Sequence, residues 1–373
     1  MTAGLQLAGS EFEVGVAEAA PTDWHMLLAA DPMADYPHTA HWNESVCANR
    51  SGARQLWWTV RRDGQLVGGQ VAVLTPSFRR LGGVLSLHRL DSSVEGTSGG
   101  PLLHPDLAAT TQDDLFIHLT GDLLARRPSG LATAAIALNP LREARFGHLL
   151  APVAGWIRHD SPTAMVPLRG GLEVVEKQRM VMNKRNERNR GLRRGAEVFA
   201  TREADLLAAY YPIYEQASSH WGVVPAPLGL LQDLLADPQD QVFFTCVRHD
   251  GQVIGGHLCL QLGDRVFAWN GVTDPAFART HFPATLCFWG DLVEACRRGA
   301  KWLDFGASGG VNSLAGFKKY FGAELMERGF YVNDSAGLKT LRRWSDLVGR
   351  AQQGANERWH DGATGKPHVG GPA

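Results

Sequence analysis

One apolar segment in the second half of the chain contains an aspartate, Asp304, and is followed by a lysine, Lys318, that could do chemistry. Residues 302–306 (WLDFG) predict a buried strand, and a loop of small residues follows it at 307–312. Lys318 comes shortly after that loop, within 316–322 (GFKKYFG), where its ammonium could stabilise an oxyanion or bind a phosphate. The alternative is a solvated lysine on an amphipathic helix, like its neighbour Lys319.

Asp304 and His220 are the other two candidates for a catalytic role. Asp304 lies inside the apolar segment, where an ionised carboxylate is costly unless it has a partner. It could orient an amine or pair with Lys318, and the alternative is a structural carboxylate that caps the following loop. His220 could act as a general base near neutral pH. Because Trp221 follows it directly, the alternative is a packed histidine without a chemical role.

A strongly basic helix is predicted over residues 173–195. Its basic residues are Lys177, Arg179, Lys184, Arg185, Arg188, Arg190, Arg193 and Arg194. An excess of one sign suits the recognition of phosphate, on a nucleotide-linked acceptor or on the acceptor end of a tRNA. Arg185 and Arg188 lie on one face of the helix and are the best single candidates. The alternative is a solvated basic face, and the lack of interleaved aromatic residues makes the helix weak evidence for RNA binding.

Several classes of chemistry are not supported by the sequence. The five cysteines form no Cys-x-x-Cys pair or nucleophile motif, and the 14 histidines show no ligand spacing, so we expect no metal site. The formal net charge of −1 means that attraction to a polyanion requires a local basic patch. No apolar stretch reaches the roughly 20 residues of a membrane span, and residues 1–20 lack the basic region of a secretory signal. We therefore expect a cytoplasmic protein with free thiols.

The elements that must position these residues occur twice. Residues 60–69 (VRRDGQLVGG) return as residues 247–256 (VRHDGQVIGG), with seven of ten positions identical and a shift of 187 residues from Gly64 to Gly251. Each copy joins two apolar runs through Asp-Gly, which is typical of a β-hairpin with a tight primed turn. A repeat this long implies two copies of a whole domain, and 373 residues are enough for two.

Each half of the chain is predicted to run helix, hairpin, strand, helix, strand. The elements expected in the first half are a helix at 43–49, a hairpin at 55–74, a helix at 111–126 and a strand at 131–138. Those expected in the second half are helices at 206–219, 227–236 and from Pro283 to Gly299, a hairpin at 241–261, and strands at 265–270 and 302–306. This order predicts an α/β fold in which a mixed antiparallel and parallel sheet is flanked by helices. We expect domains at 1–160 and 161–345, and a flexible tail at 346–373.

The order of elements and six motifs resemble the Fem-type aminoacyltransferases and related GNAT-like acyltransferases. The motifs are 39–42 (TAHW), 99–101 (GGP), 185–195 (RNERNRGLRRG), 269–271 (WNG), 301–306 (KWLDFG) and 316–322 (GFKKYFG). The resemblance covers about residues 30–335. It implies two tandem GNAT-like domains, the second of which carries most of the motifs.

The resemblance also implies a function and a set of site residues. Such enzymes transfer an aminoacyl group from aminoacyl-tRNA, or an acyl group, to an amine, here of a phosphate-bearing cell-envelope precursor or a small metabolite. The family has a functional lysine where this chain has Lys318, and no covalent intermediate is needed. Its plan puts Tyr214, His220 and Trp221 beside the substrate groove of the second half. Asn270 and Phe317 fall in matched motifs and are expected to contact substrate.

The acyl donor is where the chain departs from the family pattern. A GNAT enzyme normally binds the pyrophosphate of acetyl-CoA with glycine-rich backbone at the start of a helix. The corresponding residues 279–285 (RTHFPAT) contain no glycine, and Pro283 removes a donor. We therefore expect no tightly bound cofactor and favour aminoacyl-tRNA over acyl-CoA. A CoA-dependent acetyltransferase and a non-catalytic module that binds RNA or an anion remain the alternatives.

Overall fold

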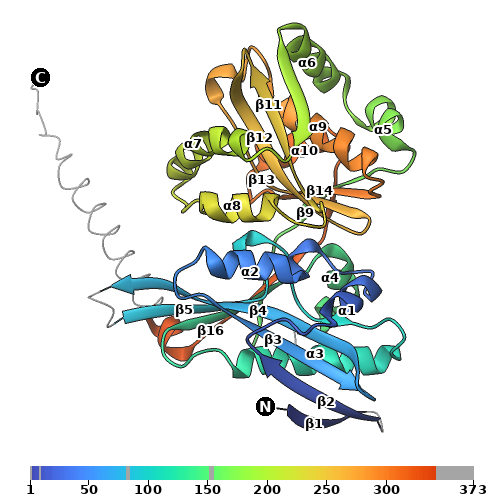
Figure 1. The fold of residues 1–373 in the computed structure, drawn as a ribbon, viewed down its shortest axis with the longest axis vertical. Coiled ribbons are helices and arrows are strands. Elements are labelled where there is room, and N and C mark those ends of the chain that lie inside the picture. The colour runs from blue at the N-terminus through green and yellow to red at the C-terminus, as the bar shows by residue number, and fades with distance from the viewer. Residues whose placement is uncertain (1, 8–9, 81–84, 151–154, 342–373) are drawn as a thin grey trace, which may run out of the picture.

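The chain forms two lobes, one above the other, each with its own sheet and its own helices (Figure 1). The computed structural model describes residues 2–7, 10–80, 85–150 and 155–341. The expected tail at 346–373 lies outside these residues. No described helix is both long and apolar enough to cross a membrane.

The repeated segments form two equivalent hairpins. The turn residues Asp63 and Gly64 have φ values of 53° and 78°, and Asp250 and Gly251 have 48° and 78°. Positive φ at both positions is the geometry of a type I′ turn, which matches the twist of the flanking strands. Each hairpin also has an irregularity in its register at the equivalent point, after Val60 in one and Val247 in the other. The prediction of both hairpins is confirmed.

The first sheet has the strand order β1-β2-β3-β4-β5-β7-β16-β8, with β6 paired to β4. Its strands are β1 (Thr2–Leu7), β2 (Ser10–Ala17), β3 (Arg54–Arg62), β4 (Gln65–Arg80), β5 (Leu85–Asp91), β6 (Leu102–Leu103), β7 (Ala132–Ala137), β8 (Ile157–Asp160) and β16 (Gly329–Asp334). The helices of this lobe are α1 (Trp24–Ala30), α2 (Ala40–Ala48), α3 (Ala109–Ala125) and α4 (Pro140–Leu150), with short turns η1 (Tyr36–His38) and η3 (Val94–Gly96).

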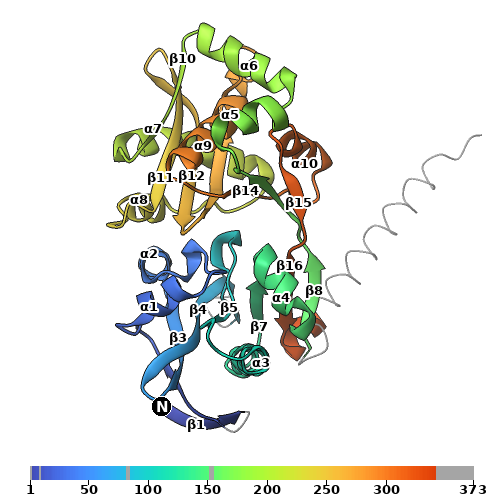
Figure 2. The ribbon, with the colours of Figure 1, turned by 90° about the vertical axis from the view of Figure 1, so that its right-hand side faces the viewer.

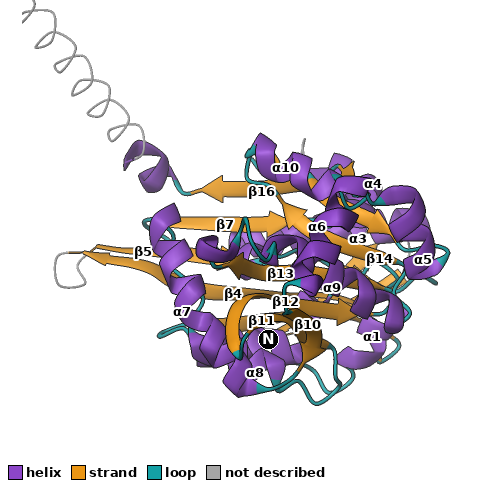
Figure 3. Cartoon of the chain, turned by 90° about the horizontal axis from the view of Figure 1, so that it is seen from above, coloured by secondary structure: helices purple, strands orange, loops and turns teal. Residues whose placement is uncertain are grey.

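The second sheet has the order β10-β11-β12-β13-β14-β9-β15. Its strands are β9 (Thr163–Pro167), β10 (Ala196–Thr201), β11 (Val242–His249), β12 (Gln252–Leu262), β13 (Arg265–Thr273), β14 (Trp302–Ala307) and β15 (Glu324–Met326). Its helices are α5 (Gly171–Val174), η4 (Val175–Arg179), α6 (Met182–Arg193), α7 (Ala204–Trp221), α8 (Leu228–Leu235), η5 (Pro275–Phe277), α9 (Pro283–Arg297) and α10 (Asn312–Lys319). Helices α7 and α8 cover one face of the sheet and α9 the other (Figures 1 and 3).

The chain passes between the lobes twice. It leaves the first sheet after β8 and enters the second at β9, and it returns after β15 to insert β16 between β7 and β8 (Figure 2). Strand β16 therefore belongs to the first sheet, although it falls within residues 161–345, which the sequence division assigns to the second domain.

The surface between the lobes is an apolar core of its own. It joins Tyr36, Trp42 and Val46 of the first lobe to residues of α7, α8, β11 and β12. The rings of Trp42 and Trp269 meet edge to face, with centroids 5.1 Å apart. Burial of this kind stabilises one relative placement of the two lobes.

One predicted element is wrong in its extent. The basic segment 173–195 is not a single helix, because the chain is extended at Met180 and Val181, between η4 and α6. Met180 is buried in the core, and the Val181 backbone N–H donates to the carbonyl oxygen of Tyr320 at 2.9 Å. These tertiary contacts outweigh the local preference of the sequence for helix.

Candidate active site at the junction of the two lobes

The two parallel strands of the second sheet separate part of the way along their length. Strands β13 and β14 pair from Arg265 and Trp302 as far as Phe267 and Asp304, and no further. Just beyond this point, Trp269 is an extra residue in the pairing of β13 with β12, which makes a β-bulge. A bulge next to a strand opening exposes backbone groups to a ligand and is frequent near active sites.

Lys318 lies at the C-terminal end of β14 and is buried, with 3% of its surface exposed. Its Nζ donates to the carbonyl oxygens of Gly306 and Ala307, both at 2.9 Å. Burial lowers the pKa of Lys318 to about 8. Its neighbour Lys319 is exposed. Lys318 is thus held by the strand end and is not a solvated lysine of an amphipathic helix.

Asp304 is the last residue of β14 that pairs with β13. Its Oδ1 accepts hydrogen bonds from Thr163 Oγ1 and from the Gly306 backbone N–H, the latter at 2.7 Å. The carboxylate therefore does cap the following turn, as one of the two interpretations of the sequence expected. Its other oxygen, Oδ2, has no hydrogen-bond donor among the described residues. Burial raises the pKa of Asp304.

A cavity of about 60 Å³ lies between the lobes next to Asp304. Its walls are mostly apolar, and they include Trp302, Met165 and Leu260 of the second lobe. Four charged side chains among the described residues line the cavity. Asp304, Arg265 and Arg328 belong to the second part of the chain, and Asp35 belongs to the first lobe.

Asp35 and Arg265 join the lobes across this cavity. Arg265 Nε donates to Asp35 at 2.9 Å, and its Nη1 donates to the carbonyl oxygen of Pro32 at 2.9 Å. Asp35 also accepts from Ser98 Oγ at 2.7 Å and Asn139 Nδ2 at 2.5 Å. Burial alone would raise the pKa of Asp35, but Arg265 and the hydrogen bonds outweigh it and lower the pKa to about 2.

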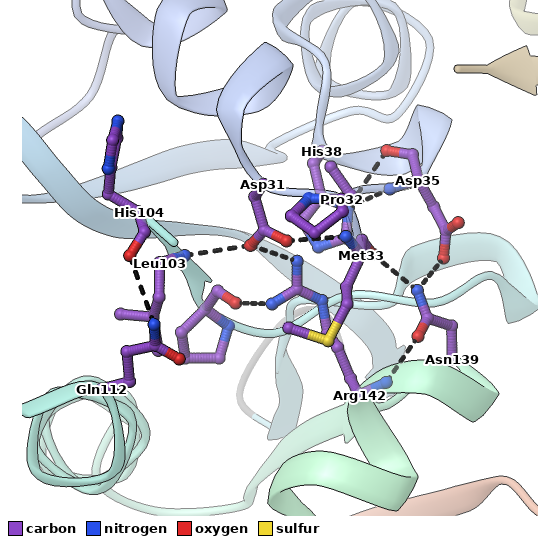
Figure 4. Close-up of polar contacts among 12 residues, drawn as sticks. Asp31, Pro32, Met33, Asp35, His38, Leu103, His104, Gln112, Asn139 and Arg142 are labelled. Atoms are coloured by element: carbon purple, nitrogen blue, oxygen red, sulfur yellow. Dashed lines mark hydrogen bonds and ion pairs between the residues drawn. The ribbon is translucent and has the colours of Figure 1, made fainter. Parts of the chain in front are cut away.

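A second buried ion pair supports the first-lobe wall, beneath Asp35 (Figure 4). Arg142 on α4 donates to Asp31 at 2.8 Å, and neither side chain is exposed. Asp31 also accepts from the backbone N–H groups of Met33 at 2.8 Å and Leu103 at 3.0 Å. Nearby, burial lowers the pKa of His38 to about 4. The Asp31–Arg142 pair therefore ties α4 to the loop that carries Asp35.

Sequence reasoning missed this network. Asp31, Asp35 and His38 come from a loop-rich stretch, and the Asn139, Arg142 and Arg265 partners of the two aspartates lie about 100 to 230 residues away. The one available signal was the density of acidic residues and histidine in a segment where the chain has no regular element.

Three of the predicted substrate-binding residues make contacts with other residues of the protein. Asn270 is buried and accepts a hydrogen bond from Tyr210 at 2.8 Å. The hydroxyl of Tyr214 accepts from the backbone N–H of Ala226 at 2.9 Å. Phe317 packs edge to face on Phe288, with ring centroids 5.1 Å apart. None of the three predicted residues lines the cavity.

The structure does not bring His220 and Trp221 to the cavity either. Both lie at the C-terminal end of α7, where His220 is exposed and Trp221 is 59% exposed. Gly222 ends the helix in the left-handed conformation, with φ of 69°. Neither residue lines the cavity, so a role in the chemistry would need a ligand that reaches from the cavity to the end of α7.

Arg185 and Arg188 differ in their surroundings. Arg188 forms an ion pair with Glu176 at 2.6 Å and lies over the ring of Trp289, 5.0 Å from its centroid. Arg185 has no ion pair or hydrogen bond with any described residue. Of the two, Arg185 is free to meet an external anion.

The start of α9 offers little to a pyrophosphate. Phe282 precedes it in the left-handed conformation, with φ of 52°, and Pro283 is its first residue. The Glu187 carboxylate accepts a hydrogen bond from Thr285 Oγ1 at 2.6 Å in the first turn of this helix. A protein carboxylate here occupies the region where a helix terminus attracts an anionic ligand.

A buried pair on the α9 face also escaped the sequence analysis. His257 Nδ1 lies 2.5 Å from Asp291 Oδ2, and both residues are buried. Gly271 faces the ring, and a Cβ added there would lie 2.0 Å from His257 Cδ2. Within the described residues, no group of three or more His, Cys, Asp or Glu side chains could hold a metal ion.

Comparisons with known proteins bear on this geometry. Residues 178–319 match the family described as the acetyltransferase (GNAT) domain. The crystal structure of FemX resembles the chain with a TM-score of 0.63 at 13% identity, over 88% of this chain and 99% of that one. A tandem GNAT protein from the clavulanic acid biosynthesis pathway resembles it with a TM-score of 0.51 at 14% identity, over 87% and 98%. A comparison with curated proteins finds no match.

These findings confirm the predicted fold class of two tandem GNAT-like units, each a mixed sheet flanked by helices. The family match falls on the second lobe and ends at Lys319, so it includes both Asp304 and Lys318. Residues 178–319 therefore match a GNAT acetyltransferase domain, and the chain has a fold built from two lobes of this kind.

Proposed function

We propose that the chain forms an amide by transferring an aminoacyl or acyl group to an amine that enters from the cavity between the lobes. The observation that carries this proposal is the position of Asp304. It lines the cavity, and it is also the residue at which β13 and β14 separate, two positions before Gly306, which holds Lys318. An amine beside Asp304 would face an acyl carbonyl held in the strand opening.

Lys318 would stabilise the oxyanion of the tetrahedral intermediate. A lysine ammonium has three N–H bonds, and two of them are used by Gly306 and Ala307. The third is free for the developing negative charge, in a buried setting where such a bond is strong. Asp304 Oδ2 would accept a proton from the attacking amine, for which a raised pKa is suited. The leaving group departs with a proton, and no covalent intermediate forms.

Aminoacyl-tRNA is the donor that we favour. The start of α9 lacks a glycine-rich loop, begins with Pro283 and has Glu187 close by, and each of these features disfavours a pyrophosphate. The basic helix α6, with Arg185 unpaired, supports a phosphate-bearing ligand such as a tRNA end or a nucleotide-linked acceptor. Acyl-CoA is the second candidate, and the match to the acetyltransferase family favours it.

The donor is tested by incubating the purified chain with aminoacyl-tRNA or with acetyl-CoA, in the presence of a panel of primary amines. The panel should contain amino acids, amino sugars, nucleotide-linked amino sugars and polyamines, with amide products detected by mass spectrometry. Titration calorimetry with acetyl-CoA runs in parallel. We expect transfer from aminoacyl-tRNA, and clear binding and turnover of acetyl-CoA would contradict the donor preference.

The role of Lys318 is tested by Lys318→Ala, with Lys319→Ala as the matched control. Removal of one oxyanion-hole donor lowers kcat by about 100- to 1,000-fold in a serine protease, and we expect a loss of this size. Lys319 is exposed, so its variant should keep full activity. Full activity in Lys318→Ala would remove the catalytic assignment.

A further inference from the structure

Arg328 is a buried arginine whose hydrogen bonds are incomplete. It lies between β15 and β16, is 7% exposed and lines the cavity between the lobes. Its Nη2 donates to the carbonyl oxygens of Thr97 and Gly96 in the first lobe. Its Nε is buried without a hydrogen-bond partner among the described residues. A buried guanidinium with a free donor is costly unless a ligand supplies the missing acceptor.

No carboxylate of the described chain neutralises Arg328 directly. Asp35 lines the same cavity, but its two oxygens are taken by Arg265, Ser98 and Asn139. Asp304 acts on Arg328 through space, and the two do not form an ion pair. The cavity therefore has a guanidinium on one side and a carboxylate on another. Arg328 Nη1 and Asp304 Oδ2 make no hydrogen bond with a described residue, and these are the atoms that a ligand in the cavity would meet.

The rest of the wall narrows the chemistry of that ligand. Leu141, Met165, Phe267 and Trp302 give the cavity an apolar lining. Arg265 is already paired with Asp35, so only one cation is available to an anion. A phosphate dianion usually needs several donors or cations, whereas a single carboxylate matches one guanidinium in charge and shape.

We propose that the acceptor is an α-amino acid with an apolar side chain, whose carboxylate binds Arg328 and whose amine lies at Asp304. This inference rests on the proposed function and names its acceptor. The new bond joins the amine nitrogen to the acyl carbon, and the bond from that carbon to the donor oxygen or sulfur breaks. The neutral amine loses one proton to Asp304, and this proton then passes to the departing oxygen or sulfur of the donor. The product is an N-acyl or N-aminoacyl amino acid.

The test measures binding without any acyl donor. L-Leucine and the other standard amino acids are titrated into the full chain and followed by saturation-transfer NMR and calorimetry. Two analogues of leucine separate its charges: 3-methylbutylamine lacks the carboxylate, and 4-methylpentanoate lacks the amine. The dipeptide leucyl-leucine shows whether the acceptor is a free amino acid or the end of a peptide. We expect an apolar amino acid to bind more tightly than either analogue.

Three variants decide whether the proposed contacts are made. Arg328→Gln can still donate to Thr97 and should weaken amino-acid binding by about 10- to 100-fold, because a hydrogen bond to a charged group is lost. Asp304→Asn should weaken the amino acid and 3-methylbutylamine but not 4-methylpentanoate. The control is Arg145→Gln, which breaks an ion pair with Asp113 outside the cavity and should change nothing. Thermal melts check that each variant is folded.

Two results would overturn the inference. One is the absence of binding by any of the amino acids, and the other is binding that Arg328→Gln leaves unchanged. Failure of this inference can be distinguished from failure of the proposed function. Amino-acid binding without acyl transfer would keep this site and reject the function, whereas transfer to simple amines regardless of Arg328 would do the reverse.

Discussion

The Lys318 ammonium has three N–H bonds, and the carbonyl oxygens of Gly306 and Ala307 accept two of them. A neutral amine has only two N–H bonds, so deprotonation removes the one that would reach an oxyanion. Because burial lowers the pKa of Lys318 to about 8, we expect kcat to fall as the pH rises through this value. The measurement is a pH profile of single-turnover transfer, with Lys319→Ala as the control that should give the same profile.

Protein stability should change in the opposite direction over the same pH range. The unfolded chain holds the Lys318 proton up to about its ordinary pKa of 10.5, whereas the folded chain releases it near 8. The unfolded state therefore binds more protons between these values, and the contribution of Lys318 to stability rises with pH there. A loss of activity above pH 8 thus cannot come from unfolding caused by this residue. A rate that stays level to pH 10 would contradict the assignment.

At the level of the elements, each copy of the repeated hairpin has a glycine at a position where the neighbouring atoms leave no room for a side chain, Gly69 in the first copy and Gly256 in the second. A Cβ at Gly256 would lie 2.2 Å from Phe244 Cζ, and one at the equivalent Gly69 would lie 2.4 Å from the carbonyl oxygen of Trp58. We expect Gly256→Ala to lower the free energy of unfolding by about 1 to 3 kcal/mol through overpacking. Urea denaturation measures this value.

The matched control is Gly121→Ala, since Gly121 lies in α3 and has no atom within 4 Å of an added Cβ. It should be neutral or raise stability by about 0.5 to 1 kcal/mol, as alanine favours a helix over glycine. Equal effects of the two substitutions would mean that the close packing of the hairpin is not what requires glycine in the repeat.

Local chemistry explains which elements could be predicted from the sequence. The Asp-Gly turns, the apolar runs beside them and the start of α9 at Pro283 are all short-range signals, and each was confirmed. Strand β16 and the Arg265–Asp35 contact depend on residues about 200 apart in the chain, for which a single sequence has no signal. The same holds for Arg328, whose place in the cavity is set by the return of the chain to the first lobe.

In the whole molecule, three features hold the lobes in one arrangement. The chain crosses between them twice, the apolar core around Trp42 joins them, and Arg265 reaches from the second lobe to Asp35 in the first. The candidate site is formed only in this arrangement, because its cavity takes walls from both lobes. A change at the lobe junction should therefore affect stability and acceptor binding together.

Arg265→Ala tests this connection, because it leaves Asp35 largely buried without its cation. Removing one partner of such a pair costs about 3 to 5 kcal/mol, and we expect a loss near this size in urea denaturation at pH 7. The pKa of Asp35 is lowered from 3.8 to about 2, so its contribution is fully present above 3.8 and is lost as the pH falls toward 2. The variant should lose this acid dependence.

The matched control is Arg54→Ala, which removes the exposed pair with Glu18 and should cost at most about 1 kcal/mol. If both variants lowered the free energy of unfolding by the same small amount, the contact between Arg265 and Asp35 would not be what holds the two lobes together.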